Sequence, residues 1–153
     1  MKGDCEAAAP FDTRLNEAAT IVDVDDGALN AYARAIGEKP SAELLARKGL
    51  IEHGWLTNAG VILFAKEPGR FIVRSEIEVD CRIGRAAESG LPDGGRSCVF
   101  DMPTATVLPA IRDHVCGILF DEQVASNGDY PVAAWMKRLM NAIVHRDYTA
   151  RGD

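Results

Sequence analysis

Apolar residues recur at helical spacing in the first part of the chain and predict a short helix there. The spaced residues are Leu29, Tyr32, Ala33 and Ile36. Asp25 or Asp26 can cap the first turn, and Gly37 suits the end because glycine readily accepts a left-handed backbone. Residues 1–20 show no sustained period, so we expect them to form a flexible lead-in.

A second short helix is expected between Ser41 and Gly49, with two adjacent leucines facing inwards. A turn at His53-Gly54 then joins two short apolar pairs into a small hairpin. The order helix, helix, hairpin resembles half of a winged-helix unit. A helix that reads DNA carries basic residues, whereas this one offers only Arg47 and Lys48, so core packing is favoured over DNA recognition.

The middle of the chain combines a short apolar run with a longer alternating stretch. The run from Val61 to Ala65 has no diagnostic period, but a cap at Thr57 and a stop at Pro68 favour a short buried helix. Alternation of apolar and polar residues over 71–83, with one slip near Ser75, predicts a strand with one solvent-facing side.

A glycine-rich loop is expected over residues 84–95, followed by a return strand over 97–100. Beyond it, apolar residues at helical spacing predict a long helix that starts near residue 102. These residues are Val107, Ile111, Val115, Ile118 and Leu119. Pro109 must lie in the first turn of this helix or kink it, because proline lacks the N–H that a helix interior uses. A loop over 126–131 leads to the last segment.

The last segment, residues 131–153, is amphipathic and predicts one continuous helix. Its apolar stripe consists of Val132, Trp135, Met136, Leu139, Met140 and Ile143. The opposite side carries Lys137, Asn141, His145 and Tyr148 at spacings of three or four residues. On pattern alone, a core stripe with a solvated polar face is the favoured interpretation.

The order helices, strands, helices predicts an α+β fold, in which helices pack on a small, mainly antiparallel sheet and long helices close the chain. With 153 residues, of which 47% are hydrophobic, the chain can bury one core. We therefore expect a single domain over residues 21–153. Its parts would be a helical region over 21–68, strands over 71–100 and helices over 102–148.

Composition limits the cellular location and the binding partners that we expect. No apolar run approaches the roughly 20 residues of a membrane span, and the start lacks a signal-peptide layout, so we expect a cytoplasmic protein without membrane contact. The net charge of −6 opposes non-specific nucleic-acid binding. Residues 1–45 hold nine acidic and four basic side chains, a net charge of −5, so any nucleic-acid contact is expected in the later part.

The four cysteines stand singly without a CxxC pair, and we expect them to be reduced and mostly buried. His114 and Cys116, with Cys98 upstream, have a spacing from which a metal site can be drawn. A surface histidine beside two buried thiols is favoured instead, because no fourth ligand is apparent.

A family resemblance adds to this pattern. The motif LMNAIVHRDY, preceded by a tyrosine-proline loop, resembles the signature of bacterial transcriptional regulators related to RecG, a family named for ATP-dependent DNA helicases. The likeness extends back through the strand ending RIGR, the segment LTNAGVILFAKEPGRF and the opening PFDTRLN. It covers the chain from about Phe11 to Tyr148.

The resemblance implies a place for this chain within a longer protein. Such regulators often carry an upstream Schlafen AlbA-type domain and a C-terminal region similar to the ATP-binding fold of gyrase B, heat-shock chaperones and histidine kinases. The last helix would correspond to the start of that fold. By this carry-over Asn141 is the candidate contact for ATP and for its Mg²⁺, with His145 and Asp147 near the phosphates. An amide oxygen suits Mg²⁺, which keeps several waters and needs few protein ligands.

Two departures from the family pattern argue against catalysis. Hydrolysing relatives place a glutamate as general base four residues before the asparagine, whereas Lys137 stands here. The glycine-containing motif that normally follows is absent, because the chain ends at Asp153. No Walker loop is present either. We therefore expect a non-catalytic fragment that does not bind ATP and Mg²⁺ tightly by itself.

Three functions stay open at this point. The first is a regulatory fragment of a DNA-associated transcriptional regulator, whose parent binds DNA or RNA through another domain. The second is a protein-interaction or dimerisation module with a degenerate nucleotide-binding fold, which would form homo-oligomers. The third, an enzyme using His145 and Asp147, is disfavoured because no nucleophile or second carboxylate is placed beside them.

Overall fold

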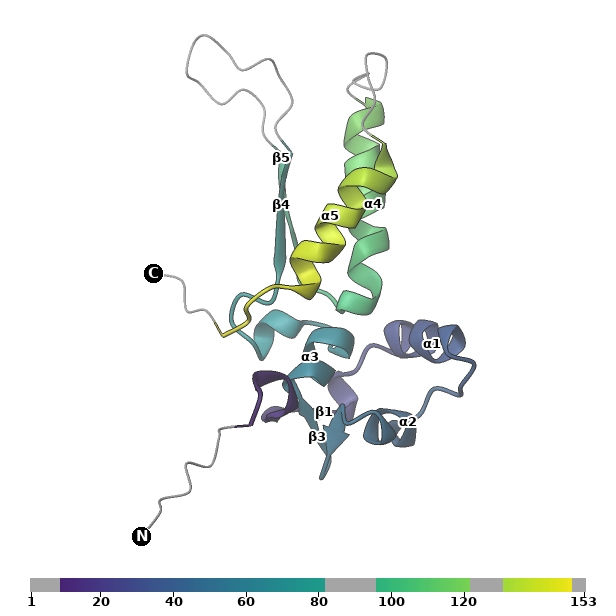
Figure 1. Cartoon of the computed structure of the whole chain (residues 1–153), viewed down its shortest axis with the longest axis vertical. Helices are drawn as coiled ribbons and strands as arrows, with labels where there is room; N and C mark the ends of the chain where they lie inside the picture. Colours follow the sequence, from purple (N-terminus) through teal and green to yellow (C-terminus); the bar gives the residue numbers. More distant parts are fainter. Residues whose placement is uncertain (1–8, 82–95, 122–130, 150–153) are drawn as a thin grey trace.

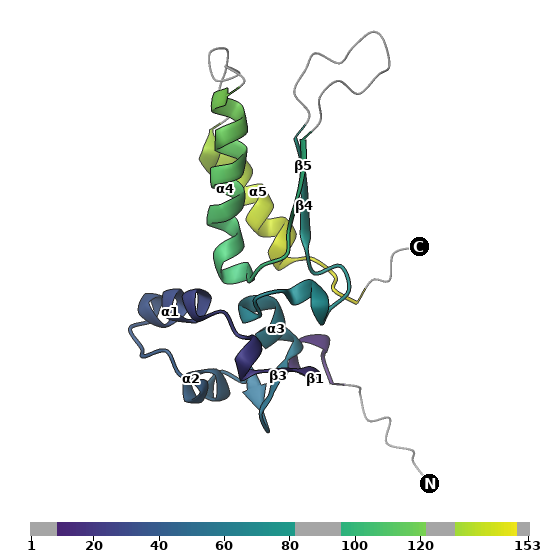
Figure 2. The ribbon, with the colours of Figure 1, turned by 180° about the vertical axis from the view of Figure 1, so that it is seen from behind.

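The computed structural model describes residues 9–81, 96–121 and 131–149, which form an α+β fold (Figures 1 and 2). The first body comprises η1 (Phe11–Thr13), β1 (Leu15–Thr20), η2 (Ile21–Asp23), α1 (Asp26–Ala35), α2 (Ala42–Arg47), β2 (Ile51–Glu52), β3 (Trp55–Thr57), α3 (Asn58–Phe64) and η3 (Pro68–Arg70). The second body comprises β4 (Ile77–Cys81), β5 (Arg96–Phe100), α4 (Thr104–Asp121) and α5 (Val132–Val144). The expected α+β class with long C-terminal helices is confirmed.

Local capping explains the first two helices. The Asp25 carboxylate accepts a hydrogen bond from the Ala28 N–H at 2.7 Å at the start of α1. The Ser41 hydroxyl accepts one from the Leu44 N–H at 3.2 Å at the start of α2. Gly37 and Gly49 follow these helices with φ of 71° and 69°, a conformation that glycine adopts without steric cost. Both predicted helices are confirmed.

The expected hairpin is also present, and it belongs to a three-stranded antiparallel sheet with the order β1–β3–β2. His53 and Gly54 form its turn with φ of 52° and 89°. The strand β1 differs from the flexible lead-in expected over residues 1–20, of which 1–8 lie outside the described residues. Leu15 pairs with Thr57 of β3. Backbone hydrogen bonds to this distant strand therefore hold β1 in place, and the local side-chain pattern does not reveal them.

Helix α3 lies at the centre of the first body and confirms the predicted short buried helix. The Thr57 hydroxyl accepts a hydrogen bond from the Gly60 N–H at 3.2 Å, which caps the helix. Its buried residues are Asn58, Gly60, Val61, Ile62 and Phe64. The Asn58 amide donates to the Phe11 carbonyl at 2.9 Å, and its oxygen accepts from the Asn16 amide at 3.3 Å. These bonds hold η1 and β1 against α3.

The strand expected over residues 71–83 begins later than predicted. Pro68 starts the 3₁₀ helix η3, and the Ile72 N–H bonds to the Pro68 carbonyl, so the chain is still turning at residue 72. Arg74 then adopts φ of 62°, and β4 begins at Ile77. The prediction was therefore wrong for residues 71–76, where local turns replace sheet pairing. Residues 82–83 and the expected loop 84–95 lie outside the described residues.

Strands β4 and β5 pair antiparallel from Ile77 opposite Phe100 to Cys81 opposite Arg96, which confirms the predicted return strand. One side of this ribbon packs against α4 and α5 (Figures 1 and 2). Val107, Ile111 and Ile143 form the buried centre of this second cluster. Partly buried around them are Ile77, Val79, Phe100, Met102, Leu108, Val115, Trp135 and Leu139.

Helices α4 and α5 differ from their predictions in detail. Pro109 lies inside α4, beyond the first turn. The Leu119 side chain and most of the loop 126–131 lie outside the described residues. Helix α5 ends at Val144 and not at the end of the chain, so the prediction of one continuous helix was wrong. Met140, expected in the apolar stripe, is 46% exposed.

The two bodies meet where α4 contacts α3 and α1. None of the helices in the described ranges has the length and apolar character required to cross a membrane.

Gly60 allows α3 to approach the carbonyl of Leu50 closely. A Cβ atom at Gly60 would lie 2.2 Å from that oxygen, which is fixed by a 3.0 Å hydrogen bond from the Thr57 N–H. We therefore expect Gly60→Ala to lower the free energy of unfolding by about 2 kcal/mol or more, measured by chemical denaturation.

The matched control is Gly117→Ala in α4, where an added Cβ would meet nothing within 4 Å. This change should raise the free energy of unfolding by about 0.5–1 kcal/mol, because alanine favours a helix interior over glycine. Equal effects of the two substitutions would contradict the close approach at Gly60.

Candidate functional site

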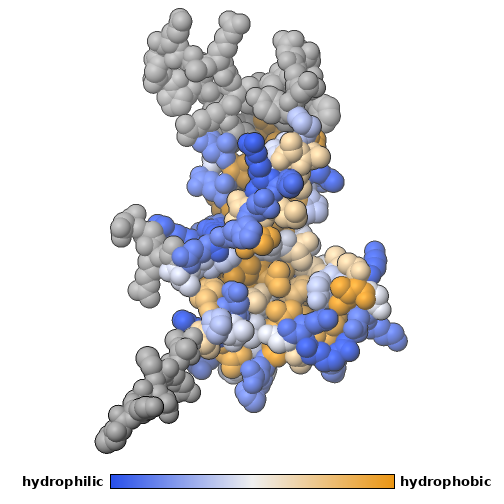
Figure 3. Space-filling model, in the orientation of Figure 1, coloured by the Kyte–Doolittle hydropathy of each residue, from blue (hydrophilic) through white to orange (hydrophobic). Residues whose placement is uncertain are grey.

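Helix α5 carries the candidate polar face that the sequence predicts. Lys137, Asn141 and His145 are all exposed and follow one another at intervals of one helical turn. The opposite face is held against the second cluster, where Ile143 is buried and Leu139 is partly buried. Figure 3 shows polar side chains along the front of the second body, where α5 lies in Figure 1, and apolar surface on the first body.

The structure brings together only part of the predicted site. Asn141 and His145 share the exposed face, and the His145 N–H closes the last turn by bonding to the Asn141 carbonyl at 3.0 Å. Asp147 lies in the turn beyond the helix. Its carboxylate accepts from the N–H and the hydroxyl of Thr149 at 2.8 and 2.6 Å. Because α5 ends at Val144, Asp147 does not continue the face formed by Asn141 and His145.

Arg146 makes a contact that the sequence pattern did not reveal. Its guanidinium donates to the carbonyl of Glu76 at 2.9 Å and also to the carbonyl of Arg74. Arg74 is one of the two described non-glycine residues with positive φ, and Glu76 immediately precedes β4. Arg146 therefore fastens the end of α5 to the connection between the first and second bodies.

Tyr148 continues this connection into the first body. Its ring is partly buried against the first hydrophobic cluster, and its hydroxyl donates to the Ile143 carbonyl at 3.4 Å. The Arg146 guanidinium carbon lies 5.4 Å from the centre of the ring. Burial raises the pKa of Tyr148; the positive charge of Arg146 lowers it and the negative charge of Asp12 raises it. The segment 145–149 thus joins the polar end of α5 to the first core.

Opposite charges act on a cation at the end of α5, where the positive Arg146 guanidinium lies directly beyond the helix. The last carbonyl groups of a helix carry a partial negative charge, which attracts a cation within the last turn. Within the described ranges, no group of three histidine, cysteine or acidic side chains could hold a metal ion. A divalent cation at Asn141 would therefore take most of its ligands from water or from a bound phosphate.

The alternative metal site drawn from the sequence has no support in the described residues. Cys98 and Cys116 are free thiols and only partly buried, whereas we expected buried thiols. His114, expected at the surface, is also partly buried, and its ring packs edge-on against Phe100 with 5.6 Å between ring centres. Cys5 and the Cys81 side chain lie outside the described residues.

Comparison with protein-family models, with curated proteins and with solved structures found no match to this chain. The family resemblance therefore stays a prediction from the sequence motifs.

The fastening role of Arg146 predicts a measurable loss of stability. Arg146→Ala removes two charge-assisted hydrogen bonds to main-chain carbonyls. We expect the free energy of unfolding to fall by about 1 kcal/mol, reduced from the usual value because the side chain is only partly buried. The Ser75 N–H, which bonds to the Ile72 carbonyl in the same turn, should also exchange faster with solvent.

Arg112→Ala is the matched control, because among the described residues the exposed Arg112 guanidinium pairs with its sequence neighbour Asp113, at 2.7 Å, and with no other element. This substitution should change the free energy of unfolding by less than about 0.5 kcal/mol. If both arginine variants lose the same stability, Arg146 does not fasten α5.

The raised pKa of Tyr148 predicts the shape of the alkaline stability curve. The neutral phenol contributes stability that is fully present below its ordinary pKa of 10.0 and is lost as pH rises through the raised folded-state value. Tyr148→Phe should therefore show a smaller loss of unfolding free energy at alkaline pH than the unmodified chain. Denaturation midpoints measured across that range test this, and two parallel curves would contradict it.

Proposed function

We propose that this chain is the regulatory middle region of a DNA-associated bacterial transcriptional regulator, in which the exposed face of α5 contacts a magnesium-bound nucleotide without hydrolysing it. One observation carries the proposal. Asn141 and His145 stand one turn apart on an exposed face, and the residues that follow them are anchored to the first body. This arrangement places a ligand-accessible surface directly beside a connection between two cores.

The chemistry of the face suits a cation bridged to phosphates. The Asn141 amide oxygen is a neutral oxygen ligand, and Mg²⁺ binds such oxygens while keeping waters and substrate phosphates around it. The carbonyl end of α5 adds a favourable field for the cation. His145, at the C-cap, can donate a hydrogen bond to a phosphate oxygen.

Lys137 gives the proposed site its non-catalytic character. An ammonium group donates hydrogen bonds and attracts phosphate, but it accepts no proton from water while it is charged. Lys137 is exposed and lies one helical turn before Asn141 on the same face. The face therefore favours binding of a nucleotide over activation of a water molecule.

A route for regulation follows from the contacts beyond the helix. Arg146 bonds to the carbonyls that lead into β4, and Tyr148 packs on the first cluster. A ligand that orders the end of α5 would stabilise these contacts. It would therefore shift the equilibrium towards the state in which the two bodies are fastened together. DNA or RNA would be bound by another domain of the parent protein.

The nucleotide contact is tested with Asn141→Ala in the chain continued through the ATP-binding domain that the resemblance implies. Isothermal titration with Mg-ATP should show affinity weakened by about tenfold or more, because a ligand of the cation is removed. Asn30→Ala is the matched control, since Asn30 is also an exposed helical asparagine but lies in α1. It should leave the affinity unchanged.

Absence of any binding heat from the folded, continued chain would overturn the nucleotide proposal. Equal affinities of the Asn141→Ala and Asn30→Ala variants would remove Asn141 from the contact. Absence of binding heat would favour the alternative of a protein-interaction module with a degenerate nucleotide-binding fold.

A further inference from the structure

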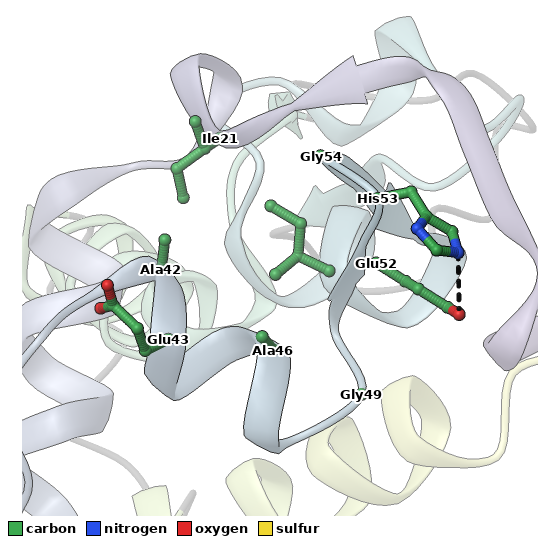
Figure 4. A pocket seen from close by; sticks show the side chains of 9 residues that line it. Ile21, Ala42, Glu43, Ala46, Gly49, Glu52, His53 and Gly54 are labelled. Carbon is green, nitrogen blue, oxygen red and sulfur yellow. Dashed lines mark ion pairs between the residues drawn. The ribbon is translucent and has the colours of Figure 1, made fainter.

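A groove of about 710 Å³ lies between α2 and the β2–β3 hairpin, on the first body (Figure 4). We call it the α2–hairpin groove. It is separate from α5, which belongs to the second body (Figure 1). Its size falls in the range of ordinary ligand and side-chain binding pockets.

The groove exists because small residues line both of its sides. Ala42 and Ala46 stand one helical turn apart on α2, Gly49 lies between α2 and β2, and Gly54 lies in the turn between β2 and β3. Ile51 and Ile21 add apolar surface, and Ile21 is 39% exposed. Because these side chains are small, they leave an apolar hollow, and its contact with water is unfavourable.

Apolar surface continues beyond the hollow itself. Trp55, which pairs across the hairpin with the lining residue Glu52, is 37% exposed. An exposed tryptophan and an exposed isoleucine at one groove are typical of a protein-binding surface, where aromatic residues commonly supply much of the binding energy.

The rim of the groove is acidic. Figure 4 shows Glu43 on α2 and Glu52 on β2 at opposite sides, and none of the described residues that line the groove is lysine or arginine. A main-chain hydrogen bond and the Ser41 hydroxyl lower the pKa of Glu43, so its carboxylate is charged at neutral pH. The Glu52 carboxylate lies 3.4 Å from Nε2 of the neighbouring His53, and this contact offsets the charge of Glu52 only where the imidazole is protonated. Two carboxylates on opposite sides attract a cationic partner.

The nearby basic residues do not reverse this charge. The Arg47 guanidinium is bound to Glu38 at 2.6 Å, and Lys48 lies beyond the residues that line the groove. In a winged-helix arrangement, α2 and the hairpin are the elements that would face DNA. Carboxylates on both elements repel phosphates, so the charge favours a basic peptide over nucleic acid.

We propose that the α2–hairpin groove docks a peptide segment of a protein partner. The segment inserts an aliphatic or aromatic side chain beside Ala46 and sets flanking lysine or arginine residues against Glu43 and Glu52. The apolar contact supplies most of the affinity, and the two carboxylates select a partner with positive charge.

The test selects short random peptides displayed on phage against the folded 153-residue chain. We expect enriched peptides to combine a large apolar residue with neighbouring lysine or arginine. Their affinity, measured by fluorescence anisotropy, should be lost in Ala46→Trp, because the indole fills the groove. Ala134→Trp, which changes an exposed alanine of α5 in the same way, should bind the peptides as the unmodified chain does.

The two carboxylates at the rim are tested separately. The double variant Glu43→Gln with Glu52→Gln should bind the selected peptides about fivefold more weakly at low salt, and the loss of affinity should be smaller at high salt. Failure to enrich any peptide, an acidic consensus, or binding that survives Ala46→Trp would overturn the proposal. Tighter binding of a duplex DNA probe by the double glutamine variant, lost in Ala46→Trp, would assign the groove to nucleic acid instead.

Discussion

The fold depends on how closely α3 can approach the strand segment before the hairpin. Gly60 faces the Leu50 carbonyl at a distance that leaves no room for a side chain. With α3 in that position, η1, β1, β3, α1, η3 and α4 all contact it. One backbone contact thus sets the arrangement of the first body and the place where the second body meets it.

The same geometry determines what each end of the molecule offers to partners. The second body presents an exposed polar face on α5, fastened at its end by Arg146 and Tyr148. The first body presents an apolar groove with an acidic rim between α2 and the hairpin. These two surfaces differ in chemistry and lie on different cores.

Elements whose signals are local could be predicted from the sequence. Helices α1, α2 and α3 have a cap and a buried face within a few residues, and their bounds agree closely with the prediction. Strand β1 could not be predicted, because its order comes from pairing with β3, far away in sequence. The strand expected from residue 71 failed because the turn after Pro68 overrides the alternation of side chains.

Only the residues of the candidate site that lie within helix α5 could be predicted, because their helical spacing is visible in the sequence. The period placed Asn141 and His145 on one face, but it also extended α5 beyond Val144. Arg146 bonds to carbonyls 70 and 72 residues earlier, and main-chain acceptors leave no signature in a sequence. The groove was missed for a similar reason, since Ala42 and Ala46 carry no chemical signal until the hairpin lies opposite them.

Among the residues that the structure describes, the two hydrophobic clusters share no buried residue, and this separation affects how the chain opens. Each cluster is small enough to act as its own cooperative unit, with a local opening free energy below that of the whole molecule. The contacts of Arg146 and Tyr148 set how strongly opening of one unit favours opening of the other. Weak cooperativity between the units would let the second body rearrange while the first keeps its shape.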